Sequence, residues 1–131
     1  MKILITGVAG LLGSRLADWI IKNTNHKVIG VDDLSGGYTE NIPKKVKFYK
    51  FDLKELDRVN KLFNQHRPDI VYHFAAYAAE GLSPFIRKFN YENNLIASTN
   101  LITCSIKYDI KRFVFASSMS VYGDKYKPPF H

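Results

Sequence analysis

The chain has 131 residues, of which 46% are hydrophobic and 24% charged, a composition that fits one soluble globular domain with a buried core. No apolar run approaches the roughly 20 residues that span a bilayer, and the amino-terminal segment lacks a signal-peptide pattern. The net charge of +7 is typical of some nucleic-acid-binding proteins, but the basic residues are spread along the chain and lie in no nucleic-acid-binding motif. A single cysteine, Cys104, excludes an internal disulfide. We therefore expect a cytoplasmic protein with neither a membrane nor a nucleic-acid partner.

Five short apolar segments alternate with segments of helical period. The expected strands are residues 2–6, 27–33, 45–51, 70–76 and 111–118. Strands that alternate with helices at this spacing predict right-handed βαβ units. The sequence therefore predicts an α/β fold: a Rossmann-type doubly wound parallel sheet of about five strands in the order 3-2-1-4-5, with helices on both faces.

Helices are expected after the first, third and fourth strands. The first should bury a face whose apolar positions are Leu12, Leu16, Trp19 and Ile20. The second should begin at a capping box of Asp52 and Glu55. Its apolar face consists of Leu56, Val59, Leu62 and Phe63. The third should have Ser83 as N-cap, Pro84 in its first turn, and an end near Tyr108.

The segment TGVAGLLGS (residues 6–14) places three glycines between the first strand and the first helix. Gly7 permits a tight turn, Gly10 lets the backbone approach a pyrophosphate, and Gly13 lets the helix pack closely on the strand. The free N–H groups at the start of the helix then face the phosphates. This placement predicts a dinucleotide-binding loop rather than a purely structural turn.

An acidic residue at the end of the second strand supports that prediction. The Asp32 carboxylate can accept hydrogen bonds from an adenosine ribose and would repel a 2′-phosphate, and no arginine follows it closely. The pattern therefore favours NAD over NADP. Asp33 is the alternative ribose ligand, or a plain turn residue. Asp52, at the end of the third strand, can contact the adenine as well as cap its helix.

Polar residues are also expected in the core. Asn94 shares a helix face with Ala97, Leu101 and Cys104, so it needs a hydrogen-bond partner there. It either clamps the backbone near the fourth or fifth strand or makes a plain structural hydrogen bond. His73 should be a core hydrogen-bonding residue rather than a base, and Cys104 a small core residue rather than a nucleophile. The histidine and cysteine spacings predict no metal site.

Six blocks in order resemble the extended short-chain dehydrogenase/reductase superfamily, in its branch of nucleotide-sugar epimerases and dehydratases, and look closest to UDP-glucose 4-epimerase-like proteins. The blocks are TGVAGLLG, VDDLSGG, FDLKE, HFAA, NNLIASTNLI and SSMSVYGD. The segment YAAEGLSPF (77–85) departs from the 4-epimerase pattern in a loop that borders the substrate. The resemblance therefore does not identify the sugar.

The resemblance implies roles for individual residues. Ser118 falls on the catalytic Ser/Thr, which hydrogen-bonds the substrate oxygen during hydride transfer, and Ser117 and Ser120 are its neighbours. The implied NAD-binding residues are Gly7, Gly10, Leu11, Leu12, Gly13, Asp32, Asp33, Leu34, Asp52, Leu53, Phe74, Ala75, Ala76, Asn94 and Ser117.

The superfamily's Tyr-x-x-x-Lys pair is not found, because none of the eight tyrosines has a lysine four residues later. We therefore expect residues 1–131 to form the NAD-binding domain of a longer enzyme, inactive alone, with its C-terminal UDP-sugar-binding part absent. The last strand should then be an open edge that exposes Phe113 or Phe115, and we expect self-association or a homodimer. The alternative is a non-catalytic NAD-sensing or scaffold protein.

Overall fold

The computed structural model describes residues 1–123 and contains one five-stranded parallel sheet. The strands are β1 (Lys2–Thr6), β2 (Lys27–Asp32), β3 (Lys47–Lys50), β4 (Ile70–His73) and β5 (Arg112–Phe115). Their order in the sheet is β3-β2-β1-β4-β5, so the predicted doubly wound topology is confirmed.

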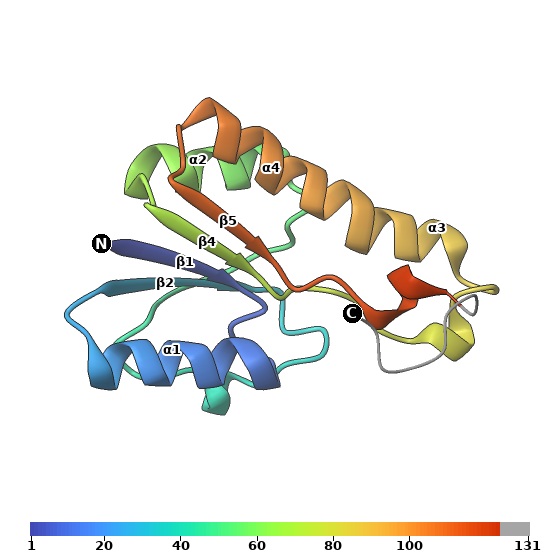
Figure 1. The fold of residues 1–131 in the computed structure, drawn as a ribbon, viewed down its shortest axis with the longest axis horizontal. Helices are drawn as coiled ribbons and strands as arrows, with labels where there is room; N and C mark the ends of the chain where they lie inside the picture. Colours follow the sequence, from blue (N-terminus) through green and yellow to red (C-terminus); the bar gives the residue numbers. More distant parts are fainter. Residues whose placement is uncertain (124–131) are drawn as a thin grey trace.

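The helices cover both faces of the sheet (Figure 1). They are α1 (Leu11–Asn23), α2 (Leu56–His66), α3 (Arg87–Asn90) and α4 (Ala97–Lys107), with a π-helical segment η3 (Tyr91–Ile96) between the last two. Helix α1 lies alone on one face, whereas α2 and α4 lie on the other. Three 3₁₀ turns complete the described elements: η1 (Thr39–Asn41), η2 (Glu80–Leu82) and η4 (Met119–Tyr122).

Residues of β1 alternate between two cores, as expected for a strand covered on both faces. Ile3 and Ile5 pack with Ala17 and Ile20 of α1, and Leu4 packs with the side chains of α2 and α4. The five residues named here are each at most 3% exposed. The two cores fix the sheet between its helix layers and leave the strand ends free to form sites.

The buried face of α1 matches the predicted one only in part: Ile20 is buried and Leu16 packs against the core, as predicted. Gly13, Ala17 and Ile20 are buried, while Leu12 is 62% and Trp19 58% exposed. Small residues occupy the buried face because the helix approaches the strand closely, and a large side chain at position 13 would not fit. In α2 the prediction holds for Val59, Leu62 and Phe63, whereas Leu56 is half exposed.

Two predicted helix starts were too early. Asp52 does not cap α2, because residues 52–55 form a turn and the helix begins at Leu56. Ser83 and Pro84 lie in a turn after η2, and α3 begins only at Arg87. The predicted ends of two strands were too late, since β4 ends at His73 and β5 ends at Phe115.

No helix within residues 1–123 is long and apolar enough to cross a membrane. The same residues contain no group of three or more His, Cys, Asp or Glu side chains placed to hold a metal ion.

Candidate cofactor-binding site

A hollow of about 400 Å³ lies at the carboxyl ends of the strands, where ligands bind in doubly wound sheets. The residues predicted for the cofactor that line it are Gly7, Gly10, Asp32, Asp33, Asp52, Leu53, Phe74, Ala75 and Ala76. They come from the ends of four different strands. The fold therefore brings together most of a site that the sequence scatters over seventy residues.

The glycine loop needs its glycines. Gly7 has a φ of +70°, and a Cβ there would lie 2.7 Å from the Ala75 nitrogen. A Cβ on Gly13 would lie 2.1 Å from the Gly7 carbonyl oxygen, a distance that no real contact tolerates. Gly13 is buried beneath the loop instead of lining the hollow, so its role is to let α1 pack against the turn.

The amino end of α1 is open to a ligand. Its N-cap, Gly10, supplies no side-chain hydrogen bond, and its first turn contains no acidic residue. Within the described part of the chain, the N–H groups of Leu11 and Leu12 have no hydrogen-bond acceptor. Because these groups and the helix dipole favour an anion, the helix end suits a pyrophosphate. The exposed Leu11 and Leu12 side chains do not line the hollow.

Asp32 holds the loop in place from the end of β2. One carboxylate oxygen accepts a hydrogen bond from the Ala9 N–H at 2.9 Å, and the other accepts one from the Leu34 N–H at 2.9 Å. Each oxygen keeps acceptor capacity for a ribose hydroxyl. Asp33 lines the same hollow, and one of its oxygens accepts hydrogen bonds from both the backbone and the hydroxyl of Ser35. Leu34, with φ +66°, shapes the turn from outside the lining.

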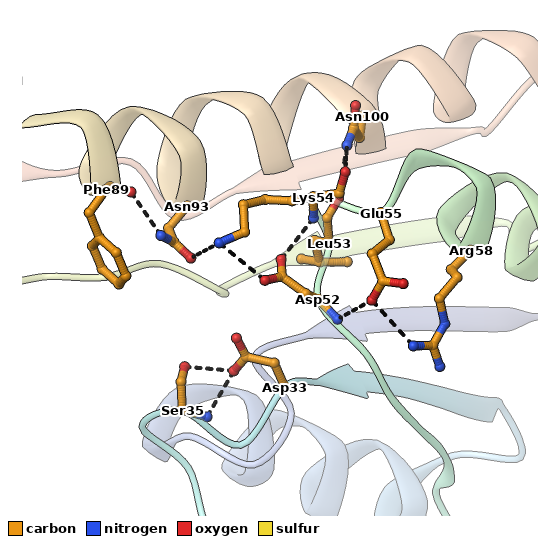
Figure 2. A network of polar contacts seen from close by, with 10 residues as sticks. All are labelled: Asp33, Ser35, Asp52, Leu53, Lys54, Glu55, Arg58, Phe89, Asn93 and Asn100. Atoms are coloured by element: carbon orange, nitrogen blue, oxygen red, sulfur yellow. Dashed lines mark hydrogen bonds and ion pairs between the residues drawn. The ribbon is translucent and has the colours of Figure 1, made fainter.

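A polar network closes the side of the hollow between the β3–α2 turn and the long helix (Figure 2). The Lys54 ammonium lies 3.1 Å from an Asp52 carboxylate oxygen and donates to Asn93 Oδ1 at 3.2 Å. The Asp52 carboxylate also accepts from the Lys54 N–H, and Asn100 Nδ2 donates to the Leu53 carbonyl oxygen. Asp52 therefore orders the turn beside the hollow, although it caps no helix.

Asn94 clamps the segment that follows β4. Its Oδ1 accepts from the Tyr77 N–H at 2.7 Å, and its Nδ2 donates to the Tyr77 carbonyl oxygen at 3.0 Å. This is the predicted backbone clamp near the fourth strand, although Asn94 is half-buried and does not itself line the hollow. The clamp fixes the backbone on which Phe74, Ala75 and Ala76 stand.

His73 is a core hydrogen-bonding residue, as predicted. It is 2% exposed, and its ring nitrogens lie 2.7 Å from Thr6 Oγ1 and 2.8 Å from Ser98 Oγ. Desolvation by burial lowers its pKa to about 4, so it is neutral at pH 7. Cys104 is likewise a core residue, and burial raises the pKa of its thiol.

Ser118 and Ser117 stand apart from the hollow. Both are exposed after β5, and neither lines it. Ser118 Oγ accepts from the Ser120 N–H and so caps η4, while Ser117 has a φ of +54°. The hollow therefore brings together most of the residues predicted to hold a cofactor, while the two serines lie at the end of the neighbouring strand.

Sequence reasoning missed several lining residues. The hollow is also lined by Lys54, Tyr77, Phe89 and Asn93, which were not predicted. Lys54 and Asn93 belong to the blocks FDLKE and NNLIASTNLI, whereas Tyr77 and Phe89 lie outside the six blocks. Gly37 carried a signal, because SGG marks a tight loop. A Cβ at Gly37 would lie 2.7 Å from the Ala9 carbonyl carbon, so this glycine lets the loop after β2 rest on the glycine loop.

Comparison with known proteins agrees with this geometry. The model of the NAD-dependent epimerase/dehydratase family matches residues 3–131. The chain belongs to this family. It is 39% identical over 128 residues to the bifunctional protein GAL10 of Kluyveromyces lactis, covering 92% of the chain and 18% of that protein. The family is NAD-dependent, so the predicted cofactor is confirmed at that level.

Solved structures of relatives share the fold. The UDP-glucose 4-epimerase of Thermotoga maritima with UDP-glucose superposes with a TM-score of 0.92 at 37% identity, covering 98% of this chain and 41% of that one. The enzyme of Bifidobacterium longum in complex with NAD⁺ and UDP gives 0.89 at 29% identity, covering 98% and 40%. Among the curated relatives it matches first, the chain spans 18% to 41% of their length.

Proposed function

We propose that residues 1–131 form the NAD-binding part of a nucleotide-sugar epimerase that acts on a UDP-sugar. The observation that supports this most strongly is the open amino end of α1 facing a hollow lined by Gly7, Gly10 and Asp32. Relatives named as UDP-glucose 4-epimerases with 34–35% identity supply the substrate class. We place the protein in the cytoplasm.

The cofactor would be held by the chain's own groups. The α1 N–H groups would bind the pyrophosphate, Asp32 or Asp33 the adenosine ribose, and Asp52 and Leu53 the adenine side. Lys54 is the one cationic residue that lines the described hollow, and it is already paired with Asp52. A 2′-phosphate would therefore meet carboxylates without a free cation, so we propose selectivity for NAD over NADP.

When bound, NAD⁺ supplies reversible hydride acceptance to such a reaction. In that reaction Ser118 would orient the sugar by hydrogen bonding to the reacting oxygen. Within residues 1–123 the Ser118 hydroxyl donates to Ser120 Oγ and accepts from the Ser120 N–H, and neither group is a base. The sequence also contains no Tyr-x-x-x-Lys pair to provide one. We therefore propose that the chain alone binds the cofactor without turning over substrate.

The absence of that pair also favours a second function, a non-catalytic NAD-sensing or scaffold protein. Both functions require NAD binding, and they differ in whether Ser118 serves a reaction.

Two assays on one sample test the proposal. NAD⁺ should raise the melting temperature of the purified chain, because a ligand that binds only the folded state stabilises it. UDP-galactose incubated with the chain and NAD⁺ should not be converted to UDP-glucose. Conversion that persists through further purification would contradict inactivity, and an unchanged melting temperature at millimolar NAD⁺ would contradict cofactor binding.

A further inference from the structure

A second hollow lies at the opposite edge of the sheet, where the strands begin. It measures about 600 Å³ and lies near the chain's amino terminus, marked N in Figure 1. Its polar lining is almost wholly basic: Lys2, Lys27, Lys45, Lys47, His26 and His66. No carboxylate is among the described residues that line it. No residue that lines this hollow also lines the first one, which adjoins the glycine loop.

The strand register places these lysines next to one another. Lys2 and Lys27 are direct partners across the β1–β2 pair, and Lys47 is the partner of Ile29, two residues beyond Lys27. Since residues two apart point to the same side of a sheet, Lys2, Lys27 and Lys47 share one face. Neighbouring strands are only about 4.8 Å apart, and like charges placed opposite one another destabilise a sheet.

Little negative charge nearby compensates this cluster. The Lys2 ammonium donates to the His66 carbonyl oxygen at 2.8 Å, so its charge interacts favourably with the carboxyl end of α2. Lys27, Lys45 and Lys47 have no carboxylate within ion-pair distance in residues 1–123. Asp69, an acid at this edge, accepts from the Lys2 N–H and pairs with Lys111 at 2.7 Å.

The positive field reaches into the hollow. The pKa of His66 is lowered, first by desolvation and then by the charges of Lys47 and Lys2. Its Nε2 lies 2.6 Å from the Tyr49 hydroxyl, so the imidazole is held in place at the wall. An anion among the lysines would relieve both the repulsion between them and their effect on His66.

We propose that this hollow, formed by the amino ends of β1, β2 and β3, binds a chain of several phosphate groups. Lysine is a compact point charge that suits phosphate oxygens, and a row of lysines on adjacent strands suits an anion whose charges also lie in a row. A nucleic acid fits less well, because the described lining contains no Phe, Tyr or Trp on which bases could stack. The phosphate chain is either inorganic or the triphosphate of a nucleotide.

The test is a calorimetric titration of the full chain with sodium tripolyphosphate at low salt. The Lys27→Gln/Lys47→Gln variant should bind at least about tenfold more weakly. The Lys50→Gln/Lys61→Gln variant removes the same charge elsewhere on the surface and should stay within roughly twofold of the unmodified chain. Removing repulsion should leave the first variant folded, with a melting temperature equal to or above that of the unmodified chain at low salt.

A second readout locates the ligand. Tripolyphosphate should raise the pKa of His66, followed by NMR, in the unmodified chain and in the control variant only. ATP that binds like tripolyphosphate would identify a nucleotide source, and ATP that binds far more weakly an inorganic one. The proposal is overturned by absent binding, by equal losses in both variants, by displacement with NAD⁺, by an unmoved His66, or by tighter binding of a DNA oligonucleotide.

Discussion

The hydroxyl of Ser98 lies 2.8 Å from Nε2 of His73 and fixes the tautomer of that imidazole. Ser98 donates its one proton to the Asn94 carbonyl oxygen, so it must accept from His73. Nε2 therefore carries the hydrogen, and Nδ1 accepts from the Thr6 hydroxyl. Thr6 Oγ1 in turn accepts from the Ala75 N–H at 3.3 Å. This directed chain joins β1, β4 and the helix that carries the Asn94 clamp.

Protonation of His73 should weaken the fold in acid. Its pKa in the folded state is about 4, below the unfolded value of 6.5, so the unfolded chain binds the proton first as pH falls. Stability is full above about pH 6.5 and should fall by about 3 kcal/mol toward pH 4. Urea unfolding across this range measures the loss, and His73→Gln should flatten it. The pKa of His66 is also lowered, so His66 adds to the loss of stability in acid. His66→Gln is therefore the control that separates the contribution of His66 from that of His73. An unchanged slope in His73→Gln would rule out this role.

Gly13→Ala should destabilise the fold by about 3 kcal/mol or more, because its Cβ would meet the Gly7 carbonyl oxygen at 2.1 Å. Gly36→Ala is the matched control, since a Cβ there has nothing within 4 Å. It should change the free energy of unfolding by less than about 0.5 kcal/mol. Urea denaturation of both variants checks the difference, and equal stabilities would contradict the close packing of α1 on the loop.

Asn94→Ala should weaken NAD⁺ binding about tenfold, because it frees the Tyr77 backbone that borders the hollow. The two lost hydrogen bonds should also cost about 1–2 kcal/mol of stability. Asn23→Ala removes one exposed hydrogen bond to the Trp19 carbonyl on α1 and should leave binding unchanged. Isothermal calorimetry distinguishes the two, and full affinity in Asn94→Ala would show that the clamp does not serve the cofactor.

The edge strand β5 should promote self-association. Within residues 1–123 it pairs with β4 on one side only, and Phe115 is 58% exposed. Light scattering should show a mass that rises with concentration, and Phe115→Lys should reduce it. Trp19→Lys changes an equally exposed residue on α1 and should have no such effect. A concentration-independent monomer would refute the prediction.

The sequence was sufficient for the topology and for the glycine loop because both follow from local patterns: apolar period, turn glycines and an acid at a strand end. It failed where packing overrides pattern. The large side chains of Leu12 and Trp19 fit the helical period of an inner face, but they are exposed, and Gly13 and Ala17 lie beside Ile20 against β1 and its loop. The Lys54–Asn93 contact joins residues 39 positions apart, and no spacing rule predicts it.

The most direct test of the cofactor site is a calorimetric titration of the purified chain with NAD⁺, with NADP⁺ as the comparison. We predict saturable binding of NAD⁺ at one site and binding of NADP⁺ at least about tenfold weaker, because the Asp32 and Asp33 carboxylates line the hollow where we propose that the ribose binds. Equal affinities would contradict the selectivity assigned to Asp32 and its neighbours. No binding of either cofactor by the folded chain would contradict the proposal that residues 1–131 form a competent cofactor site.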